Sequence, residues 1–406
     1  MKNDDDEMLD DVVLLLLIAG HRFNLLLANS LIPYKVRLSD EDRKKRDSRI
    51  PRIGLIEPSR SPFLRIFHSR NDQSLISVTG LDFKSFHYLL NKFLPLFERY
   101  SPYCATPDGL LREVRNDLAD RGRPPSLESF SCLGLVLCFT RTRGSMGVLQ
   151  MVFGLTSSVL GLWLKFGIKL LFKILLREPL AKACFPPEEE IEEFIARVNN
   201  MYPAINGVWC TMDGLKIPIQ CSGDYKTQNA YYNGWLHAHL VGCVFAFAPS
   251  GLIVAASVNN PGTWHDSFIA ENSGLYEKLN AVFQSVGGKC VVDSAFSARQ
   301  YAFLVKSAKT VTPNLTNAQI QQNVQATSLR QMAEWGMRAL QGSFPRLKDK
   351  IAFTDDHTDR KLLLSIIPLL FNFRTNFLGI NQITSHFYPL FEMQGDHALD
   401  FVDLNN

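Results

Sequence analysis

The sequence predicts an α/β protein in which a helical N-terminal region precedes a mixed sheet flanked by helices. Between residues 83 and 94, and again across 127–175, apolar residues recur at the three- and four-residue steps of helices. After Pro203 the pattern changes to apolar and alternating segments bounded by turn residues, which is typical of strands. These later segments follow the order strand, strand, strand, helix, strand, helix, so a sheet covered by helices is expected there.

The composition is that of a large globular chain. It has 406 residues, of which 46% are hydrophobic and 20% charged, and this favours two or three folded domains over disorder. A net charge of +3 is only mildly basic, so any DNA-binding surface must be local. The eight cysteines form no C-x-x-C pair and lie in apolar stretches, which favours reduced, buried thiols in an intracellular protein over disulfides or a structural zinc site.

Residues 1–75 are predicted to be a peripheral, partly flexible segment. The apolar run at 12–18 is too short to span a membrane and is preceded by acidic residues, so we expect a packed helix and no membrane association. The basic cluster at 43–46 has two interpretations: a nuclear import signal, which places the protein in the nucleus, or a solvated linker of mixed charge.

Residues 76–184 are predicted to form a helical, DNA-binding or accessory region. Asp82 is suited to cap a helix that begins at 83, and a second apolar helix is expected at 127–138. A short helix at 146–153 then reaches Gly154, and Thr156 or Ser157 can cap the next helix. This pair resembles a helix-turn-helix, although many helical hairpins use the same residue types.

Residues 200–377 are predicted to form the sheet domain, and 378–406 a C-terminal tail. The acidic run after Pro186-Pro187 suits the first turn of a helix that leads into this domain. The expected strands are 208–220, two strands within 236–258 joined by a turn at 249–251, and 289–297; the expected helices are 266–283, 328–341 and 361–377.

Three acidic residues form the candidate catalytic and metal-binding set. Asp213 lies in the first strand, Asp293 ends a buried strand, and Glu334 lies on a helix with Arg330 and Arg338 one turn away on either side. Three carboxylates that meet could hold two divalent cations, which activate a nucleophilic oxygen and stabilise the leaving one in phosphodiester cleavage. From spacing alone the alternatives stay open: a turn or cap residue at Asp213, a strand-end cap at Asp293, and a solvated helix face at Glu334.

The motifs around these acids resemble those of the PIF/Harbinger group of DDE transposases. The matching segments are MDGLKIPI at Asp213, NNPGTWHDS before the helix at 266, VVDSAFS at Asp293, and RQMAEWGMRALQGSFPRLK at Glu334. The resemblance covers residues 207–347, with weaker similarity upstream. It implies an RNase H-like core and an endonuclease that depends on a divalent metal cation, Mg²⁺ or Mn²⁺, held by Asp213, Asp293 and Glu334.

The sequence departs from the family pattern after the first acid. Leu215 and Lys216 stand where the family usually has Thr-His, and Lys216 could contact phosphate or be an ordinary strand residue. Asp266, of the pair His265-Asp266, is a further candidate for the metal, with helix capping or local hydrogen bonding as the favoured alternative. The two imidazoles of His237-x-His239 are expected on one face of a strand, packed or facing DNA rather than binding zinc.

The predicted partner is DNA. Lys165, Lys169 and Lys173 repeat every four residues along one helical face, which indicates either a phosphate-binding surface or a solvated face. Further candidates for DNA contacts are Arg141, Arg143, Lys216, His265, Arg330, Arg338, Arg346, Lys348 and Lys350. Because Harbinger-type systems pair the nuclease with a Myb-like DNA-binding protein, the resemblance implies such a partner, and self-association into a homo-oligomer is left open.

Three functions are compatible with the sequence. The first is a DNA endonuclease or transposase that performs phosphodiester cleavage and strand transfer. The second is a host-recruited, transposase-derived protein that binds DNA or protein without cleavage. The third is a phosphodiesterase that acts on RNA, which the fold would also permit.

Overall fold

The computed structural model describes residues 50–105, 111–113, 126–221, 225–296, 301–306, 315–351, 357–379 and 381–388. The chain divides into two compact units, Met1–Ile174 and Leu175–Asn406. The apolar run at 12–18 and the basic cluster at 43–46 lie outside the described residues.

The first unit is mainly helical. Its central helix is buried on nearly every side, from Ser131 to Thr140, because its sequence is apolar throughout rather than along one stripe. The elements are η1 (Arg52–Gly54), η2 (Pro58–Arg60), α3 (Pro62–Ser69), α4 (Asp72–Thr79), α5 (Phe83–Arg99), β1 (Tyr100–Ala105), β2 (Leu111–Glu113), α6 (Ser129–Arg141), α7 (Met146–Phe153) and α8 (Ser157–Leu175).

Two features of this unit differ from the sequence prediction. Helix α3 and the first half of α4 lie within the segment predicted to be peripheral, yet Phe63 and Leu75 are buried in the core. Phe63 packs so closely on α6 that a Cβ at Gly134 would lie 2.0 Å from its ring, a long-range contact with no local signal in the sequence. The region predicted to be all helical also contains a two-stranded antiparallel sheet of β1 and β2.

The predicted helix-turn-helix-like pair is present. The α7 helix ends at Gly154, whose φ of 66° is left-handed, and α8 begins at Ser157. The two helix axes differ by 91°, within the range of helix-turn-helix motifs. Asp82 caps α5 as predicted, because its side chain accepts a hydrogen bond from the Ser85 amide.

The second unit is an α/β domain. The order of its main strands and helices is the predicted one, and the acidic first turn of its first α-helix, Glu188–Glu190, follows Pro186-Pro187 as predicted. Its elements are η4 (Pro179–Ala181), α9 (Glu188–Met201), β3 (Val208–Pro218), α10 (Tyr225–Tyr231), β4 (Tyr232–Asn233), β5 (Ala238–Phe247), β6 (Ile253–Pro261), α11 (Asp266–Asn272), α12 (Leu275–Val286), β7 (Lys289–Val292), η5 (Ser294–Phe296), β8 (Leu304–Lys306), α13 (Asn317–Ser343), η6 (Pro345–Lys348), α14 (His357–Leu378) and α15 (Gln382–Phe387).

These strands form one mixed sheet in the order β4-β5-β3-β7-β8, with β6 also paired to β5. The β3, β5 and β6 strands are antiparallel neighbours, and the turn between β5 and β6 contains Gly251 with a φ of 79°. The β7 strand pairs parallel to β3, and β8 pairs parallel to β7. The change from antiparallel to parallel pairing therefore falls beside β3, the central strand.

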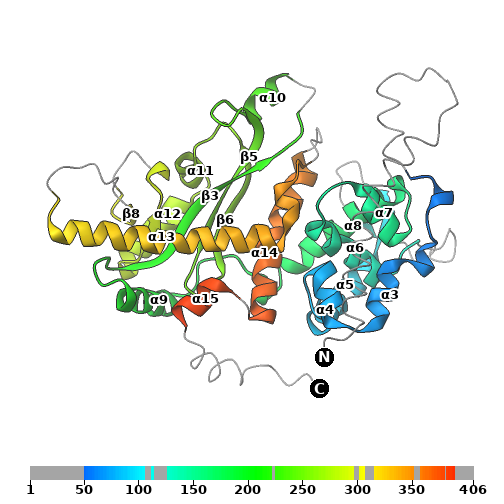
Figure 1. Ribbon diagram of the computed structural model, residues 1–406, viewed down its shortest axis with the longest axis horizontal. Coiled ribbons are helices and arrows are strands. Elements are labelled where there is room, and N and C mark those ends of the chain that lie inside the picture. The colour runs from blue at the N-terminus through cyan, green and yellow to red at the C-terminus, as the bar shows by residue number, and fades with distance from the viewer. Residues whose placement is uncertain are drawn as a thin grey trace, which may run out of the picture. The chain divides into compact units, whose positions relative to one another are not determined.

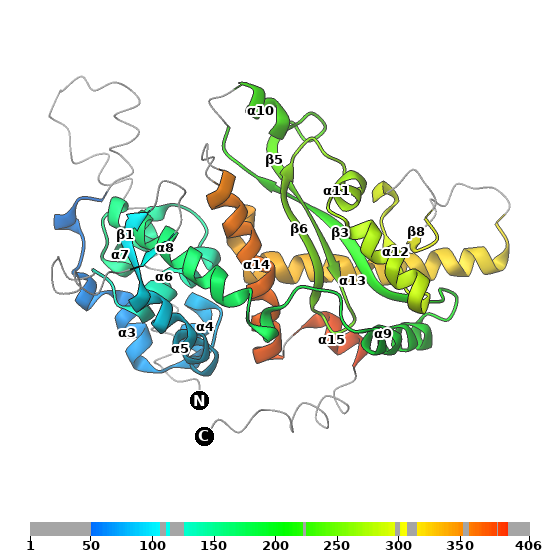
Figure 2. The same ribbon diagram turned by 180° about the vertical axis from the view of Figure 1, so that it is seen from behind.

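Helices cover both faces of this sheet. On one face, α9, α11 and α12 enclose a core that includes Trp209, Met212 and Val292. On the other face, α13 crosses the strands, in front of them in Figure 1 and behind them in the reverse view of Figure 2. Gly336 of α13 sits against the ring of Phe247 on β5, and Phe247 also meets Phe371 of α14.

The C-terminal part is more folded than its prediction as a tail. Helix α15 packs with α13, and its Ile383 and Phe387 are buried. In the described part of the chain, α14 is long and apolar enough by composition to span a membrane, and 56% of that stretch is buried in the fold; α7 and α8 pass the same test only as a bent pair.

Candidate functional site

Parallel pairing brings two of the predicted acids together. Met212 of β3 is in register with Val292, the last residue of β7, so Asp213 and Asp293 occupy the next position on each of two neighbouring strands. Met212 faces the core under α9, α11 and α12. Because side chains alternate along a strand, Asp213 is directed to the opposite face, the one that α13 crosses.

The proximity of the two acids affects the charge of Asp213. Burial raises the pKa of the Asp213 carboxyl to about 6, and the carboxylates of Asp266 and Asp293 raise it as well. The hydrogen bond from the Gly214 amide, at 2.8 Å, and the positive charge of Arg330 act in the lowering direction. Asp213 is therefore a half-buried carboxylate whose negative charge is only partly compensated by Gly214 and Arg330.

Asp293 is anchored at the point where β7 ends. Its Oδ1 accepts a hydrogen bond of 2.5 Å from the Ser294 amide, in the short helix η5 that follows the strand. Both strand carboxylates thus accept one hydrogen bond from the next residue's N–H group. This leaves carboxylate oxygens of both residues for another ligand.

The third predicted acid, Glu334, belongs to a charge network on α13. Its Oε1 lies 3.0 Å from Arg330 Nη2, and its Oε2 lies 3.9 Å from Arg338 Nη2. Since Arg330 also lowers the pKa of Asp213, its guanidinium links the helix acid electrostatically to the strand acid. Within the described ranges, no three His, Cys, Asp or Glu side chains are arranged to hold a metal ion.

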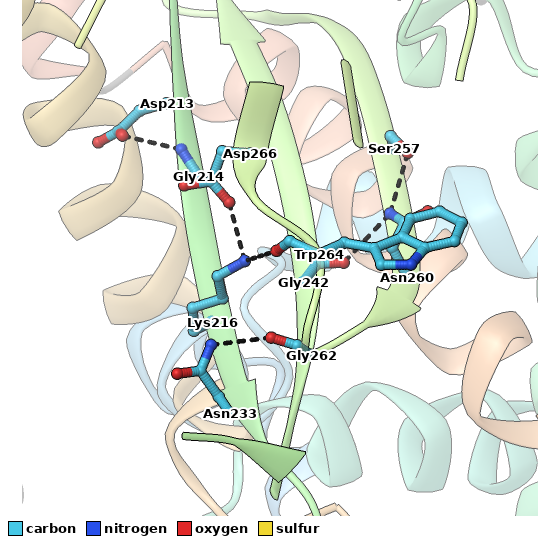
Figure 3. Close-up of polar contacts among 10 residues, drawn as sticks. All are labelled: Asp213, Gly214, Lys216, Asn233, Gly242, Ser257, Asn260, Gly262, Trp264 and Asp266. Atoms are coloured by element: carbon cyan, nitrogen blue, oxygen red, sulfur yellow. Dashed lines mark hydrogen bonds and ion pairs between the residues drawn. The ribbon is translucent and has the colours of Figure 1, made fainter. Parts of the chain in front are cut away.

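A second ion pair lies on the other face of β3, as Figure 3 shows. Lys216 Nζ lies 2.9 Å from Asp266 Oδ1 and donates a hydrogen bond of 2.9 Å to the Trp264 carbonyl. A Cβ at Gly214 would lie 2.2 Å from Asp266 Oδ2, so only glycine leaves room for this carboxylate. Lys216 and Asp266 therefore fasten α11 to β3 next to Asp213, and this pairing occupies both candidate side chains.

Two predictions need correction: the capping role of Asp266 and the strand position of His237. The N-cap residue of α11 is His265, which makes no side-chain cap bond, and Asp266 is the first helical residue rather than the cap. His265 itself is exposed, as a DNA contact would require. His237 has a φ of 49° and precedes β5, so it does not share a strand face with His239, whose Nδ1 lies 3.2 Å from Cys221 Sγ.

The predicted basic surface residues have varied surroundings. On α8, Lys165 and Lys173 are exposed and Lys169 is half-buried. Lys173 Nζ lies 4.5 Å from the ring centroid of Tyr100 and 3.3 Å from its hydroxyl, so that lysine has an aromatic neighbour already. In the second unit, Arg346 pairs with Asp349 at 3.8 Å.

Two glycines at the site carry roles that the sequence analysis did not assign. Gly214 admits Asp266, and Gly336, two residues after Glu334, lets α13 approach the sheet, since a Cβ there would lie 2.6 Å from the Phe247 ring. Gly214 directly follows Asp213, and Gly336 comes two residues after Glu334. This closeness to a predicted acid was the one sequence feature that pointed to the two glycines. Their contacts are long-range, so spacing alone could not show them.

The donor set fits a hard divalent cation. Mg²⁺ and Mn²⁺ prefer carboxylate oxygens, and a cation would relieve the repulsion that raises the pKa of Asp213. Asp213 and Asp293 could hold such an ion directly. Glu334 is paired with Arg330, and Arg330 in turn interacts electrostatically with Asp213.

Comparison with known protein families places a match in the second unit. The family described as DDE superfamily endonuclease matches residues 212–372, a stretch that contains all three predicted acids. No curated protein and no solved structure matches the chain.

Proposed function

We propose that the second unit is a DNA endonuclease of the transposase type that depends on a divalent metal cation and cleaves phosphodiester bonds with Asp213, Asp293 and Glu334. One observation carries the proposal: Asp213, in the middle of β3, and Asp293, directly after β7, each follow a member of the parallel register pair Met212–Val292, within the stretch that matches the DDE superfamily endonuclease family. The pKa of Asp213, raised to about 6, supports it, because perturbed carboxylates are typical of sites that bind cations or protons.

In this proposal Asp213 and Asp293 would hold Mg²⁺ or Mn²⁺, and Glu334, which pairs with Arg330 in this structure, would be the third ligand. The metal would activate a water nucleophile and stabilise the leaving oxygen of a phosphodiester. The Arg330 guanidinium, next to these acids, would bind a substrate phosphate. Lys216 and Asp266 act on the opposite face, where they hold β3 against α11.

Further parts of the proposal follow from the resemblance to PIF/Harbinger transposases. The sheet, an antiparallel β3-β5-β6 meander joined by the parallel strands β7 and β8, is compatible with an RNase H-like core. The 91° helix pair α7–α8 suits a DNA-binding or accessory region. We also propose strand transfer as a second activity, a Myb-like partner protein, self-association and residence in the nucleus.

The direct test is nicking of supercoiled plasmid with Mg²⁺ or Mn²⁺. We expect nicking by the wild type, none in excess EDTA, and a loss of at least about a hundredfold in Asp293→Asn. Glu192→Gln, an exposed acid on α9, is the matched control and should keep full activity. Equal nicking by Asp293→Asn and the wild type would refute the proposal, and a preference for RNA would redirect it to a ribonuclease.

Two observations favour a second candidate, a transposase-derived protein that binds DNA without cutting it. Glu334 forms an ion pair with Arg330, and no three-residue metal group exists among the described side chains. Retention of DNA by the full-length protein, without nicking at any tested Mn²⁺ concentration, would favour this candidate. Under it, Asp293→Asn would leave DNA affinity unchanged.

A further inference from the structure

The turn between β4 and β5 displays apolar side chains to solvent. Trp235 is 91% exposed, its neighbour Leu236 is 53% exposed, and Tyr232 at the base of the turn is 41% exposed. Single exposed apolar residues are common, but a fully displayed indole among apolar neighbours is not, since burial of a Trp side chain is strongly favourable. The turn therefore presents a flat aromatic surface that the described part of the protein does not cover.

This turn is held by specific hydrogen bonds. The Oδ1 atom of Asn233 accepts from the backbone amides of Trp235, at 3.1 Å, and of Leu236, at 3.0 Å. His237 closes the turn in a left-handed conformation, with a φ of 49°, and β5 begins at the next residue. The position of the indole is thus defined by the backbone before any partner arrives.

The same asparagine fastens the turn to the segment between β6 and α11. Asn233 Nδ2 donates to the Gly262 carbonyl at 2.8 Å, as Figure 3 shows. Gly262 fits this junction because a Cβ there would lie 2.2 Å from the Leu240 carbonyl oxygen. From the same segment, the Trp264 carbonyl accepts from Lys216, which also pairs with Asp266 beside Gly214. Trp235 is therefore fixed relative to Asp213 through a short chain of polar contacts.

The charge of this part of the chain suits a polyanion. Residues 225–265 contain no Asp or Glu. Their basic residues are Lys226, His237, His239 and His265. A phosphate backbone could approach the turn without repulsion from an acid of this stretch. An aromatic ring in such surroundings is the usual platform for an unpaired base, because every base has a flat face to stack.

The geometry also gives a spacing. On β5, Phe245 lies opposite Asp213, and the strand runs from there to Ala238 next to the turn. At about 3.3 Å per residue the span from Phe245 to Ala238 is about 23 Å, and the turn with Trp235 lies past Ala238. One strand of DNA rises about 3.4 Å per nucleotide, so the span along β5 corresponds to about seven nucleotides.

We propose that Trp235 is a DNA-binding residue that stacks on an unpaired base about seven nucleotides from the bond that Asp213 and Asp293 cleave. This inference rests on the proposed function, which identifies the substrate as DNA and the carboxylate site as the place of cleavage. It adds a recognition element for distorted or single-stranded DNA, on a turn remote from the carboxylates.

The test uses the full chain with Asp293→Asn, in EDTA, and a gapped duplex with 2-aminopurine in the gap. Stacking on an indole quenches 2-aminopurine fluorescence, and this readout needs no cleavage. We expect quenching on binding, its loss in the added variant Trp235→Ala, and affinity for gapped DNA about tenfold weaker, with full duplex bound equally by both. Trp235→Phe should keep most of the quenching, and Tyr103→Ala, an exposed aromatic on β1, should keep all of it.

The outcomes separate this inference from the proposed function. Quenching that depends on Trp235 supports the inference even if the wild type never nicks DNA. Nicking by the wild type with identical quenching in Trp235→Ala overturns the inference and leaves the nuclease standing. An unchanged DNA affinity together with loss of a co-purified protein in Trp235→Ala would also overturn it, because the turn would then be a protein contact.

Discussion

At the scale of single residues, the central feature is the unequal environment of the acids. Asp213 and Asp293 follow register-paired positions on β3 and β7, and burial together with the charges of Asp266 and Asp293 raises the cost of a negative charge on Asp213. Glu334 has an arginine within 3.0 Å, and Asp266 has a lysine within 2.9 Å. The negative charges of Glu334 and Asp266 are therefore each compensated by a neighbouring basic side chain. The pair Asp213 and Asp293 could accept an additional positive charge.

This imbalance predicts a pH-dependent gain in stability for Asp213→Asn in metal-free buffer. The folded pKa is about 6 and the ordinary value is 3.8, so between these values the folded state binds more protons than the unfolded state. Stability must then fall as pH rises through this window, and the full cost of the ionised carboxylate is present above pH 6. Asn removes that cost, so we expect the free energy of unfolding to rise by about 2 kcal/mol at neutral pH.

Urea denaturation near pH 4 and near pH 7 measures this difference. The gain should be small at the lower pH, because the Asp213 carboxyl is then protonated in the folded state and pH 4 is close to its ordinary pKa of 3.8, so little of the cost of ionisation has developed. The exposed Glu192→Gln is the control and should show no such pH dependence. A destabilised Asp213→Asn at neutral pH would mean that the carboxylate is compensated in the fold after all.

At the scale of elements, the site depends on how closely α13 lies on the sheet. Gly336 meets the ring of Phe247 with no room for a Cβ, and it stands two residues from Glu334 and six from Arg330. The close approach therefore sets the height of both charged side chains above β3. The parallel register of β3 and β7 sets the other half of the site.

We expect Gly336→Ala to destabilise the protein, against the usual preference of helices for alanine. The added methyl must displace either α13 or Phe247, which should cost about 1–3 kcal/mol and lower nicking activity as Glu334 moves. Gly342→Ala in the same helix is the matched control, since a Cβ there meets nothing within 4 Å. It should be neutral or stabilise by about 0.5 kcal/mol. Equal thermal unfolding of the two variants would contradict the role given to Gly336.

The elements also show what sequence patterns could and could not predict. The strands β3, β5, β6 and β7 and the helix pair α7–α8 were predicted because their apolar periodicity and turn glycines are local signals. The short strand β8 and helix α10 were not, because they are brief and depend on neighbours in space. The same limit applies to the site: the positions of Asp213 within a strand and of Asp293 at a strand end could be predicted, but the Lys216–Asp266 pair depends on the tertiary approach of α11 to Gly214.

At the scale of the whole molecule, a net charge of +3 is too small to attract DNA over the whole surface. The proposed DNA binding therefore depends on local clusters of basic residues. The α8 lysines form one such cluster in the first unit, and Lys173 among them is partly engaged by Tyr100. The second unit offers the arginines around Glu334 and the acid-free stretch at 225–265. Binding through few phosphate contacts should be weak, and its salt dependence should scale with the number of those contacts.

We therefore expect the triple variant of Lys165, Lys169 and Lys173 to Gln to bind duplex DNA more weakly and with a smaller salt dependence. Each lost phosphate contact should reduce the slope of log affinity against log salt concentration by about 0.9. The control is Lys278→Gln, an exposed lysine on α12. An unchanged slope in the triple variant, measured by fluorescence anisotropy, would show that the α8 face is only a solvated helix face.

The measurement that bears most directly on the site is calorimetric titration of Mn²⁺ into the full chain and its single variants at neutral pH. If Asp213 and Asp293 jointly hold the cation, Asp213→Asn and Asp293→Asn should each abolish binding, Glu334→Gln should weaken it, and Asp266→Asn should leave it nearly unchanged because Asp266 is committed to Lys216. Binding by the wild type should also weaken as pH falls below about 6, where Asp213 takes up a proton. Undiminished Mn²⁺ binding by the Asp213→Asn and Asp293→Asn variants would contradict the assignment of this pair as the metal-binding centre.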